Sequence, residues 1–268
     1  MASQLQTAER KLIEYRVSEG IAVITLNDPP ANTYSHEMMQ QLDARILAAR
    51  MDEGVQVIVI TGSGEKFFCA GANIQMLAHV TSEFKYYFCL HANETLSRLE
   101  QTPKLVIAAI NGHCVGGGLE VALAADIRIA RQDAGKMGLP EVSLGVLPGT
   151  GGTQRLPRII GKSKAIELMA TGDIINAQEA YQLGMVNKVV PLAELDATVD
   201  GLAKRFAQAP RVAIAKIKAG LNQDAPTDLA AALDFEAVNQ DACFHSPDFI
   251  EGVTAFLEKR KAVFGKDV

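Results

Sequence analysis

The stretch NGHCVGGGLEVALAAD, residues 111–126, carries more structural information than any other part of the chain. An apolar run ends just before Asn111, three consecutive glycines follow at 116–118, and a segment with helical spacing begins at once. Glycines at a strand-to-helix junction let a ligand approach the backbone, and the first N–H groups of a helix lack partners within it. The stretch therefore predicts either an anion or oxyanion site or a plain tight turn.

Glu120 favours the oxyanion site over the tight turn. It lies three residues after Gly117, which places both residues on one face of the predicted helix. A carboxylate beside a cradle for negative charge is unusual unless the carboxylate has a function. The sequence therefore indicates an oxyanion site with an acid or base next to it.

Other motifs with glycine or histidine do not fit. The glycine spacing after Asn111 differs from GxGxxG, and Leu156 stands where a P-loop ending at Gly161 needs its first glycine. Gln40 replaces the second histidine of an HExxH zinc motif, and the chain has no GxSxG nucleophile turn. These patterns argue against dinucleotide, P-loop, zinc-protease and serine-hydrolase functions.

Strands and helices alternate on both sides of the glycine stretch. An antiparallel hairpin is expected around Gly20, between residues 11–17 and 21–28. Beyond it, helical segments at 35–50, 81–101 and 117–125 each precede an apolar strand run, at 55–62, 104–112 and 126–130. Ser35 is a possible N-cap for the first of these helices. This order predicts an α/β fold with parallel strands.

The character of the chain changes after about residue 191. Four helical candidates follow, separated by Pro210, Pro226 and Pro247, with no strand run between them. We expect a core over residues 1–195 and a helical region over 196–268. The small apolar residues of that region suit packing on the core or on another subunit.

Composition restricts the class of protein. The chain has 268 residues, 48% of them hydrophobic, and 26 Lys and Arg against 31 Asp and Glu, so a globular fold is expected and a nucleic-acid partner is not. No apolar run reaches the roughly 18 residues that span a bilayer. The four cysteines form no CxxC pair, which suits reduced thiols and argues against structural zinc. The N-terminus lacks a secretory signal. We expect a cytoplasmic protein, or a mitochondrial matrix protein if a transit peptide has been removed.

Two further segments contain small-residue turns. In KFFCAGANIQML, residues 66–77, the turn leads from a strand region into a short helix, which is a weak sign of function by itself. In GLPEVSLGVLPGTGGTQRLPR, residues 138–158, Glu141 stands between proline and apolar residues. Taken alone, Glu141 is more typical of a solvated residue at a helix start than of a buried general acid.

Together the phrases FCAGANI, NGHCVGGGLEVALAAD and LPEVSLGVLPGTGGTQRLPR resemble the crotonase family, which is the enoyl-CoA hydratase and isomerase superfamily. The resemblance runs over nearly the whole chain. It implies a spiral of ββα repeats, with a C-terminal helical region that builds homotrimers, commonly paired as hexamers. It also implies an acyl-CoA thioester as substrate, a place in fatty acid metabolism such as β-oxidation, and no metal or separate cofactor.

The resemblance also implies roles for individual residues. The backbone N–H groups of Ala72 and Gly117 would form the oxyanion hole, and Glu120 and Glu141 would be the catalytic base and acid. The Gly149 N–H would help to hold the attacking water. Further residues would contact the substrate or its CoA moiety, the last two from a neighbouring subunit: Ala70, Ile74, Phe256 and Lys259.

Two glutamates imply a hydratase, because adding water moves protons at two places. The expected reaction is reversible conversion of a 2-enoyl-CoA into a 3-hydroxyacyl-CoA. An isomerase or another reaction of the family on a specialised acyl group is the alternative, and a non-catalytic relative that binds acyl-CoA or RNA is a third. Three residues depart from common family patterns and put CoA contacts and the setting of Glu141 in question: Asn73, Gln75 and Leu139.

Overall fold

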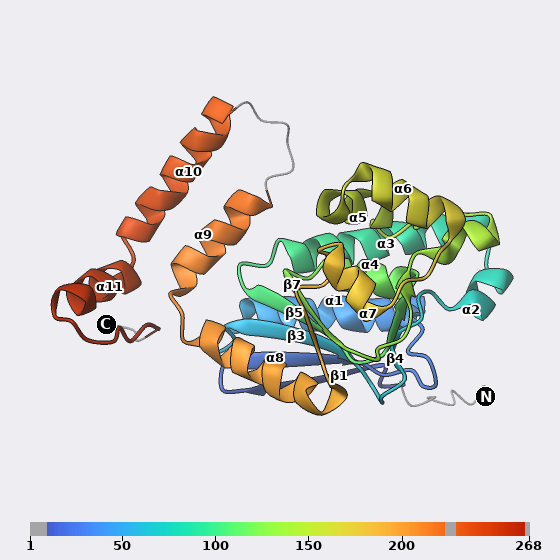
Figure 1. Cartoon of the computed structure of the whole chain (residues 1–268), viewed down its shortest axis with the longest axis horizontal. Coiled ribbons are helices and arrows are strands. Elements are labelled where there is room, and N and C mark those ends of the chain that lie inside the picture. Colours follow the sequence, from blue (N-terminus) through green and yellow to red (C-terminus); the bar gives the residue numbers. More distant parts are fainter. Residues whose placement is uncertain (1–9, 223–228, 266–268) are drawn as a thin grey trace, which may run out of the picture.

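The computed structural model of the chain describes residues 10–222 and 229–265 (Figure 1). The expectation about a targeting segment rests mainly on residues 1–9, which lie outside these ranges. The third C-terminal helical candidate also begins outside them, at Thr227. Within the described ranges, no helix is long and apolar enough to cross a membrane.

Two sheets form the centre of the fold. The main sheet has six strands in the order β1-β2-β3-β5-β7-β9, and only the β1–β2 pair is antiparallel. Its strands are β1 (Ile13–Ser18), β2 (Ile21–Leu26), β3 (Val57–Gly62), β5 (Leu105–Ile110), β7 (Ile127–Arg131) and β9 (Lys188–Val190). The small sheet is parallel, in the order β4-β6-β8, and consists of β4 (Phe67–Cys69), β6 (His113–Val115) and β8 (Met137–Gly138).

The chain winds between these sheets in repeated turns. Each turn adds one strand to the main sheet, one strand to the small sheet, and then helix. Thus β3 and β4 precede α2 (Ile74–His79) and α3 (Ser82–Glu100), β5 and β6 precede α4 (Gly117–Leu123), and β7 and β8 precede the 3₁₀ helix η1 (Pro140–Leu144) and α5 (Gly152–Ile160). The expected spiral of ββα repeats is confirmed.

Local signals account for the first elements. The β1–β2 turn consists of Glu19 and Gly20, both with positive φ, as a two-residue hairpin turn requires. Ser35 caps α1 (His36–Met51), since its hydroxyl accepts a hydrogen bond from the Met38 N–H at 3.2 Å. Thr81 caps α3 in the same way. The hairpin and both helices were predicted from the sequence and are confirmed.

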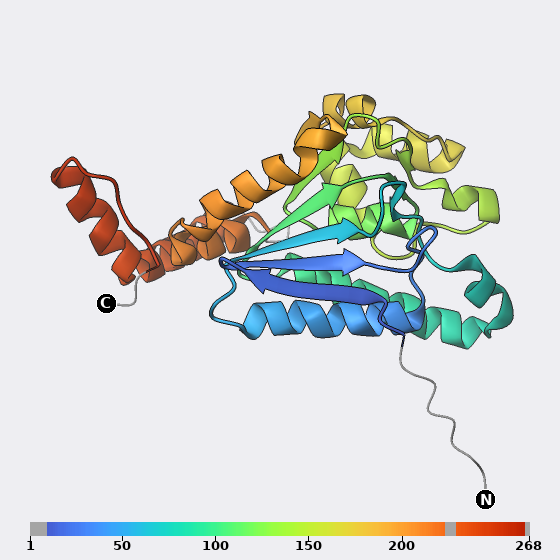
Figure 2. The same ribbon diagram turned by 90° about the horizontal axis from the view of Figure 1, so that it is seen from below.

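Helices cover both faces of the main sheet (Figure 2). In β3, Ile58 and Ile60 belong to the larger core cluster, which includes α1 and α3, whereas Val57 and Val59 belong to a second cluster beneath α8 (Leu192–Ala207). The alternation follows from the two-residue period of a strand. The expected boundary between residues 195 and 196 falls inside α8, which packs along the sheet; the division into two regions stays a prediction.

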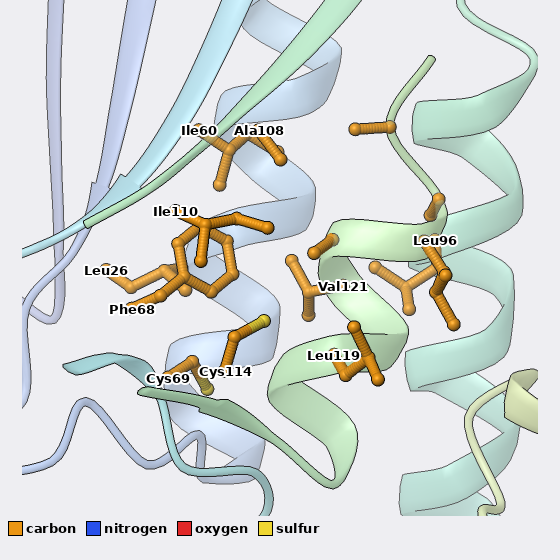
Figure 3. Close-up of a cluster of buried hydrophobic side chains, with 14 of the residues drawn as sticks. Leu26, Ile60, Phe68, Cys69, Leu96, Ala108, Ile110, Cys114, Leu119 and Val121 are labelled. Atoms are coloured by element: carbon orange, nitrogen blue, oxygen red, sulfur yellow. The ribbon is translucent and has the colours of Figure 1, made fainter. Parts of the chain in front are cut away.

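The larger core holds two of the cysteines (Figure 3). Cys69 and Cys114 are fully buried free thiols that lie beside Phe68, Ile110 and Val121. Burial raises the pKa of Cys69 to about 12, so its thiol stays protonated. The prediction that these cysteines pack rather than react is consistent with this setting.

The last three helices form an arm that projects from the core (Figure 1). They are α9 (Arg211–Leu221), α10 (Leu229–Phe244) and α11 (Pro247–Leu257), and they bound an apolar groove of about 1180 Å³. The Lys218 ammonium anchors α9 by donating to the Asp126 carboxylate at 2.8 Å and to the Lys104 carbonyl at 3.0 Å. Two further helices, α6 (Lys162–Thr171) and α7 (Ala177–Gln182), complete the core side.

Candidate active site

The N-terminus of α4 leaves a backbone donor without an acceptor. Gly116 takes the positive φ of 57° that turns the chain from β6 into α4, and its N–H donates to the Gly138 carbonyl at 2.8 Å. The next N–H, that of Gly117, has no acceptor in the part of the chain that the structure describes. This is a donor that a bound oxyanion can use.

Close packing explains two of the three consecutive glycines. A Cβ on Gly117 would overlap the Tyr34 hydroxyl, and one on Gly118 would overlap the Cys69 carbonyl. On this side of α4, close packing is sufficient to explain the glycines, as the tight-turn interpretation predicts. The backbone around Gly116 faces a different neighbour, because a Cβ there would lie 3.0 Å from the Glu141 Oε1.

Ala72 presents a second donor. It forms an isolated parallel bridge with Tyr34, in which the Tyr34 N–H donates to the Gly71 carbonyl and the Asn73 N–H donates to the Tyr34 carbonyl. This pattern leaves the Ala72 N–H on the opposite side, with no acceptor among residues 10–222 and 229–265. Gly71, with φ of 91°, brings this turn against α4: a Cβ on Gly71 would lie 3.1 Å from the Gly117 nitrogen. The donors of Ala72 and Gly117 are thus neighbours.

Glu120 is held firmly by the backbone. Its side chain is buried, with 1% of the residue exposed, and its Oε1 accepts from the Thr150 and Gly152 N–H groups at 2.7 Å each. Burial raises the pKa of Glu120, and these hydrogen bonds act in the opposite direction. Two backbone donors on one oxygen orient the carboxylate and favour its charged form.

Helix α3 fixes the loop that supplies those donors. The Asn93 side-chain amide donates to the Gly149 carbonyl at 2.7 Å, and Arg155, paired with Glu100 at 2.9 Å, donates to the Thr150 carbonyl at 3.2 Å. The Gly149 N–H itself has no acceptor in the described ranges. It is therefore open to a ligand, as its expected role in holding water requires.

Glu141 has a very different environment. Its Oε2 is buried and has no hydrogen-bond partner within the described chain. Burial, followed by the charge of Glu120, raises the pKa of Glu141 to about 7. The interpretation of Glu141 as a solvated helix-start residue is therefore wrong, because the 3₁₀ helix η1 turns its carboxyl group inward against Gly116.

The two carboxyl groups can thus divide acid and base chemistry. Glu120 has two backbone donors that favour its carboxylate, whereas Glu141 has a pKa near neutrality and can carry a proton at pH 7. Neighbouring titratable groups held in such different environments can act as base and acid in one reaction. Glu141 lies against Gly116, the residue before the free Gly117 N–H, and Glu120 is in the first turn of the helix that begins at Gly117.

The structure adds side chains that the sequence analysis did not select. Tyr34 is buried at the site, and its hydroxyl lies 3.1 Å from the Thr150 Oγ1. Cys89, on α3, lies beside Gly149, where a Cβ would be 3.7 Å from its sulfur. Thr150 lies in the glycine-rich segment of residues 138–158, so the sequence contained a signal for it. No local sequence pattern indicates that Tyr34 belongs to the site.

The remaining predicted contacts from this region lie around the Ala72 turn. Ala70 is half-buried, and Ile74 is 54% exposed at the start of α2. Asn73 caps α2, since its side chain accepts from the Met76 N–H at 2.9 Å. Gln75 is exposed. The departure from the family pattern at position 73 therefore leaves α2 with a side-chain cap.

Leu139 lies close to the site, whereas Phe256 and Lys259 lie far from it in the same chain. Leu139 is buried, and its Cδ1 would lie 2.8 Å from a Cβ on Gly152. It adds apolar surface at Gly152, where the Glu120 Oε1 also lies. Phe256 and Lys259 belong to the C-terminal arm, away from α4 in the same chain (Figure 1). Phe256 is 82% exposed, so its expected contact with a neighbouring subunit's substrate stays a prediction.

Residues 16–267 match the family model described as enoyl-CoA hydratase/isomerase. The chain is 41% identical over 247 residues to a protein named crotonyl-CoA hydratase from Syntrophomonas wolfei, covering 92% of this chain and 95% of that one. It is 40% identical over 242 residues to a short-chain-enoyl-CoA hydratase from Clostridium acetobutylicum, covering 90% and 92%.

A solved structure gives the same result. The crystal structure of an enoyl-CoA hydratase from Geobacillus kaustophilus superposes with a TM-score of 0.93 at 41% identity, covering 96% of this chain and 97% of that one. The similarity in structure and in sequence therefore extends over the same nearly complete length.

Proposed function

The chain belongs to the enoyl-CoA hydratase/isomerase family, and we propose that it adds water reversibly across the double bond of a 2-enoyl-CoA thioester. The observation that carries the proposal is the pairing of Glu120, held by two backbone donors, with Glu141, whose pKa lies near 7. Both relatives described above are named hydratases.

The thioester carbonyl would bind between the Ala72 and Gly117 N–H groups. Attack of water on the β-carbon places negative charge on the carbonyl oxygen as an enolate forms, and donors aimed at that oxygen stabilise it. Removing one such donor from an enzyme costs about 10²–10³ in kcat. The free N–H groups of these two residues support this assignment.

The two glutamates would carry the protons. The Glu120 carboxylate takes a proton from water as the water oxygen bonds to the β-carbon, and the Gly149 N–H helps to hold that water. Glu141 then gives its proton to the α-carbon, and the electron pair of the enolate forms the new C–H bond. Proton exchange between the carboxyl groups or with solvent restores the starting state. Dehydration follows the same steps in reverse.

This chemistry uses only groups of the protein and the substrate. Hydration changes no net oxidation state, so it calls for no redox cofactor, and the oxyanion donors do the work of a Lewis acid. The coenzyme A moiety would pass Ala70 and Ile74 on its way out of the site. In a homotrimer or a hexamer of two trimers, Phe256 and Lys259 of a neighbouring subunit would contact it.

The first experiment is incubation with crotonyl-CoA. We expect loss of the absorbance of the conjugated thioester and a product heavier by one water. The matched control is Glu120→Gln, which keeps an oxygen for the Thr150 and Gly152 donors but removes the base. A product of unchanged mass from 3-enoyl-CoA, with no hydration of any 2-enoyl-CoA in a panel of straight, branched and cyclic chains, would show an isomerase instead.

A further inference from the structure

We propose that Tyr34 is a positioning residue for Glu120 and acts through Thr150. Its phenol hydroxyl would hold the Thr150 side chain, and the Thr150 backbone N–H holds the Glu120 carboxylate in place. The inference rests on the proposed function, in which Glu120 is the base. It adds a residue that touches neither the water nor the thioester in that mechanism.

The fold brings Tyr34 to the site through the backbone. Tyr34 occupies the position of a small-sheet strand in the first turn of the spiral, as its parallel bridge with Ala72 shows. Its ring then lies against Gly117, where the absence of a side chain leaves room for the hydroxyl. A residue 116 positions before Thr150 is thereby brought within hydrogen-bond distance of it.

Two hydrogen bonds connect Tyr34 to Glu120 through Thr150. Tyr34 and Thr150 hydroxyl oxygens are 3.1 Å apart, and either one can donate. The Thr150 backbone N–H donates to the Glu120 Oε1 at 2.7 Å, so Tyr34 contacts the residue that holds the carboxylate. Thr150 also lowers the pKa of Glu120, which is the direction expected of a donor to a carboxylate.

Burial of all three residues increases the contribution of these hydrogen bonds. Tyr34, Thr150 and Glu120 are exposed by only 3%, 4% and 1%. Desolvation and the charge of Glu120 raise the pKa of Tyr34 well above its ordinary value, so the phenol keeps the proton that it donates. In such a low-dielectric setting, each hydrogen bond in a chain strengthens its neighbours, and a missing one leaves a polar group unsatisfied.

Packing alone does not call for the hydroxyl. The Tyr34 ring lies 5.8 Å from that of Phe88, centroid to centroid, and belongs to the main hydrophobic cluster. A phenylalanine would make these contacts equally well. Tyr34→Phe therefore separates the hydrogen bond from the packing.

The test is a double-mutant cycle on crotonyl-CoA hydration with Tyr34→Phe, Thr150→Val and both together. We expect Tyr34→Phe to lower kcat about 3- to 10-fold with little change in KM, the size of one lost buried hydrogen bond. Thr150→Val keeps the backbone N–H to Glu120 and should lower kcat at least as much. The double variant should be no worse than Thr150→Val, because Tyr34 acts through that hydroxyl.

The pH profile provides a readout that packing would not change. A less firmly held Thr150 weakens the hydrogen bond from its N–H to the carboxylate, which raises the pKa of Glu120. The acidic limb of kcat/KM should therefore move to higher pH in Tyr34→Phe and Thr150→Val. Thr150→Ser, which keeps a hydroxyl, should restore the wild-type limb. Tyr15→Phe is the matched control, since the Tyr15 hydroxyl is also buried but has no partner in the described chain; we expect wild-type kinetics.

Two kinetic results would overturn the inference while leaving the proposed function intact. One is a Tyr34→Phe enzyme with wild-type kcat and pH profile. The other is an additive loss in the double variant, which would show that Tyr34 acts independently of Thr150. If the wild type hydrates no 2-enoyl-CoA, the proposed function fails, but the positioning role of Tyr34 can still be tested by a crystal structure of Tyr34→Phe. An unchanged Thr150 rotamer and an unchanged Glu120 carboxylate would reject that role. A reoriented Thr150 would support it.

Discussion

Glu120 and Glu141 lie against different glycines: a Cβ on Gly152 would be 3.0 Å from the Glu120 Oε1, and one on Gly116 would be 3.0 Å from the Glu141 Oε1. The Glu120 Oε1 accepts two N–H groups at 2.7 Å, and the Glu141 Oε2 is buried with no partner in the described ranges. The charge of Glu120 also raises the pKa of Glu141. The two carboxyl groups therefore differ in their surroundings: backbone donors of other residues orient Glu120, whereas Glu141 has a pKa of about 7 and can supply a proton.

Glu120→Gln should lower kcat for crotonyl-CoA hydration by about 10²–10⁴, the usual contribution of a general base. The amide oxygen can still accept from Thr150 and Gly152, so the melting temperature should change little. Steady-state kinetics and thermal unfolding of the same preparation provide the check. Hydration at the wild-type rate would remove Glu120 from the mechanism.

The pH dependence of the rate should have opposite signs in the two directions. Hydration needs Glu141 protonated, and its pKa is about 7, so kcat/KM for hydration should fall as the pH rises through 7. Dehydration of 3-hydroxybutyryl-CoA needs the Glu141 carboxylate, so that rate should fall as the pH drops through the same range. Profiles measured in both directions test this, and limbs of the same sign would contradict the role of Glu141.

Glu141→Gln should stabilise the protein at alkaline pH. Burial raises the pKa of Glu141 from 4.5 when unperturbed to about 7, so the folded state binds more protons than the unfolded state between these values. Unfolding free energy is therefore lost as the pH rises through this window. The variant should melt above the wild type at pH 8.5 and close to it at pH 4.5. Equal differences at both pH values would show that Glu141 ionises freely.

Local patterns were sufficient to predict much of the fold. Ser35 and Thr81 cap helices where the sequence placed the helix starts, and Gly20 turns the hairpin. These features depend on neighbours within a few residues. The ββα winding came from resemblance to a family, because alternation of strands and helices does not say which strands enter the small sheet.

The site itself was less accessible from local patterns. Glu120 and Glu141 are 21 positions apart in the sequence. The residues around Glu141 predicted a solvated side chain, whereas its Oε2 is buried in the structure. Tyr34 was missed because only the tertiary fold brings it to Gly117 and Thr150. The glycine stretch indicated close backbone approach correctly, but part of that approach comes from the protein's own Tyr34 ring.

Lys218→Ala should destabilise the attachment of α9 by about 3–5 kcal/mol, as expected when one partner of a buried ion pair is removed. The Lys218 side chain is 4% exposed, and its ammonium reaches Asp126 at 2.8 Å. Chemical denaturation measures the loss. Lys218→Met combined with Asp126→Asn removes both charges of the pair and should recover much of the stability. A single variant as stable as the wild type would show that the arm is held by its apolar contacts instead.

The C-terminal arm should hold subunits together, because its apolar side chains are too exposed for an isolated chain. Leu221 is 81% exposed and Phe256 82%, and both line the groove between α9, α10 and α11. We expect light scattering to give the mass of a trimer or hexamer that persists on dilution, and Leu221→Asp to shift it toward smaller species. Met51→Asp is the matched control: Met51 is 76% exposed at the end of α1, outside the arm, and the substitution should leave the mass unchanged. An active wild-type monomer, or an unchanged assembly of Leu221→Asp, would contradict this role for the arm.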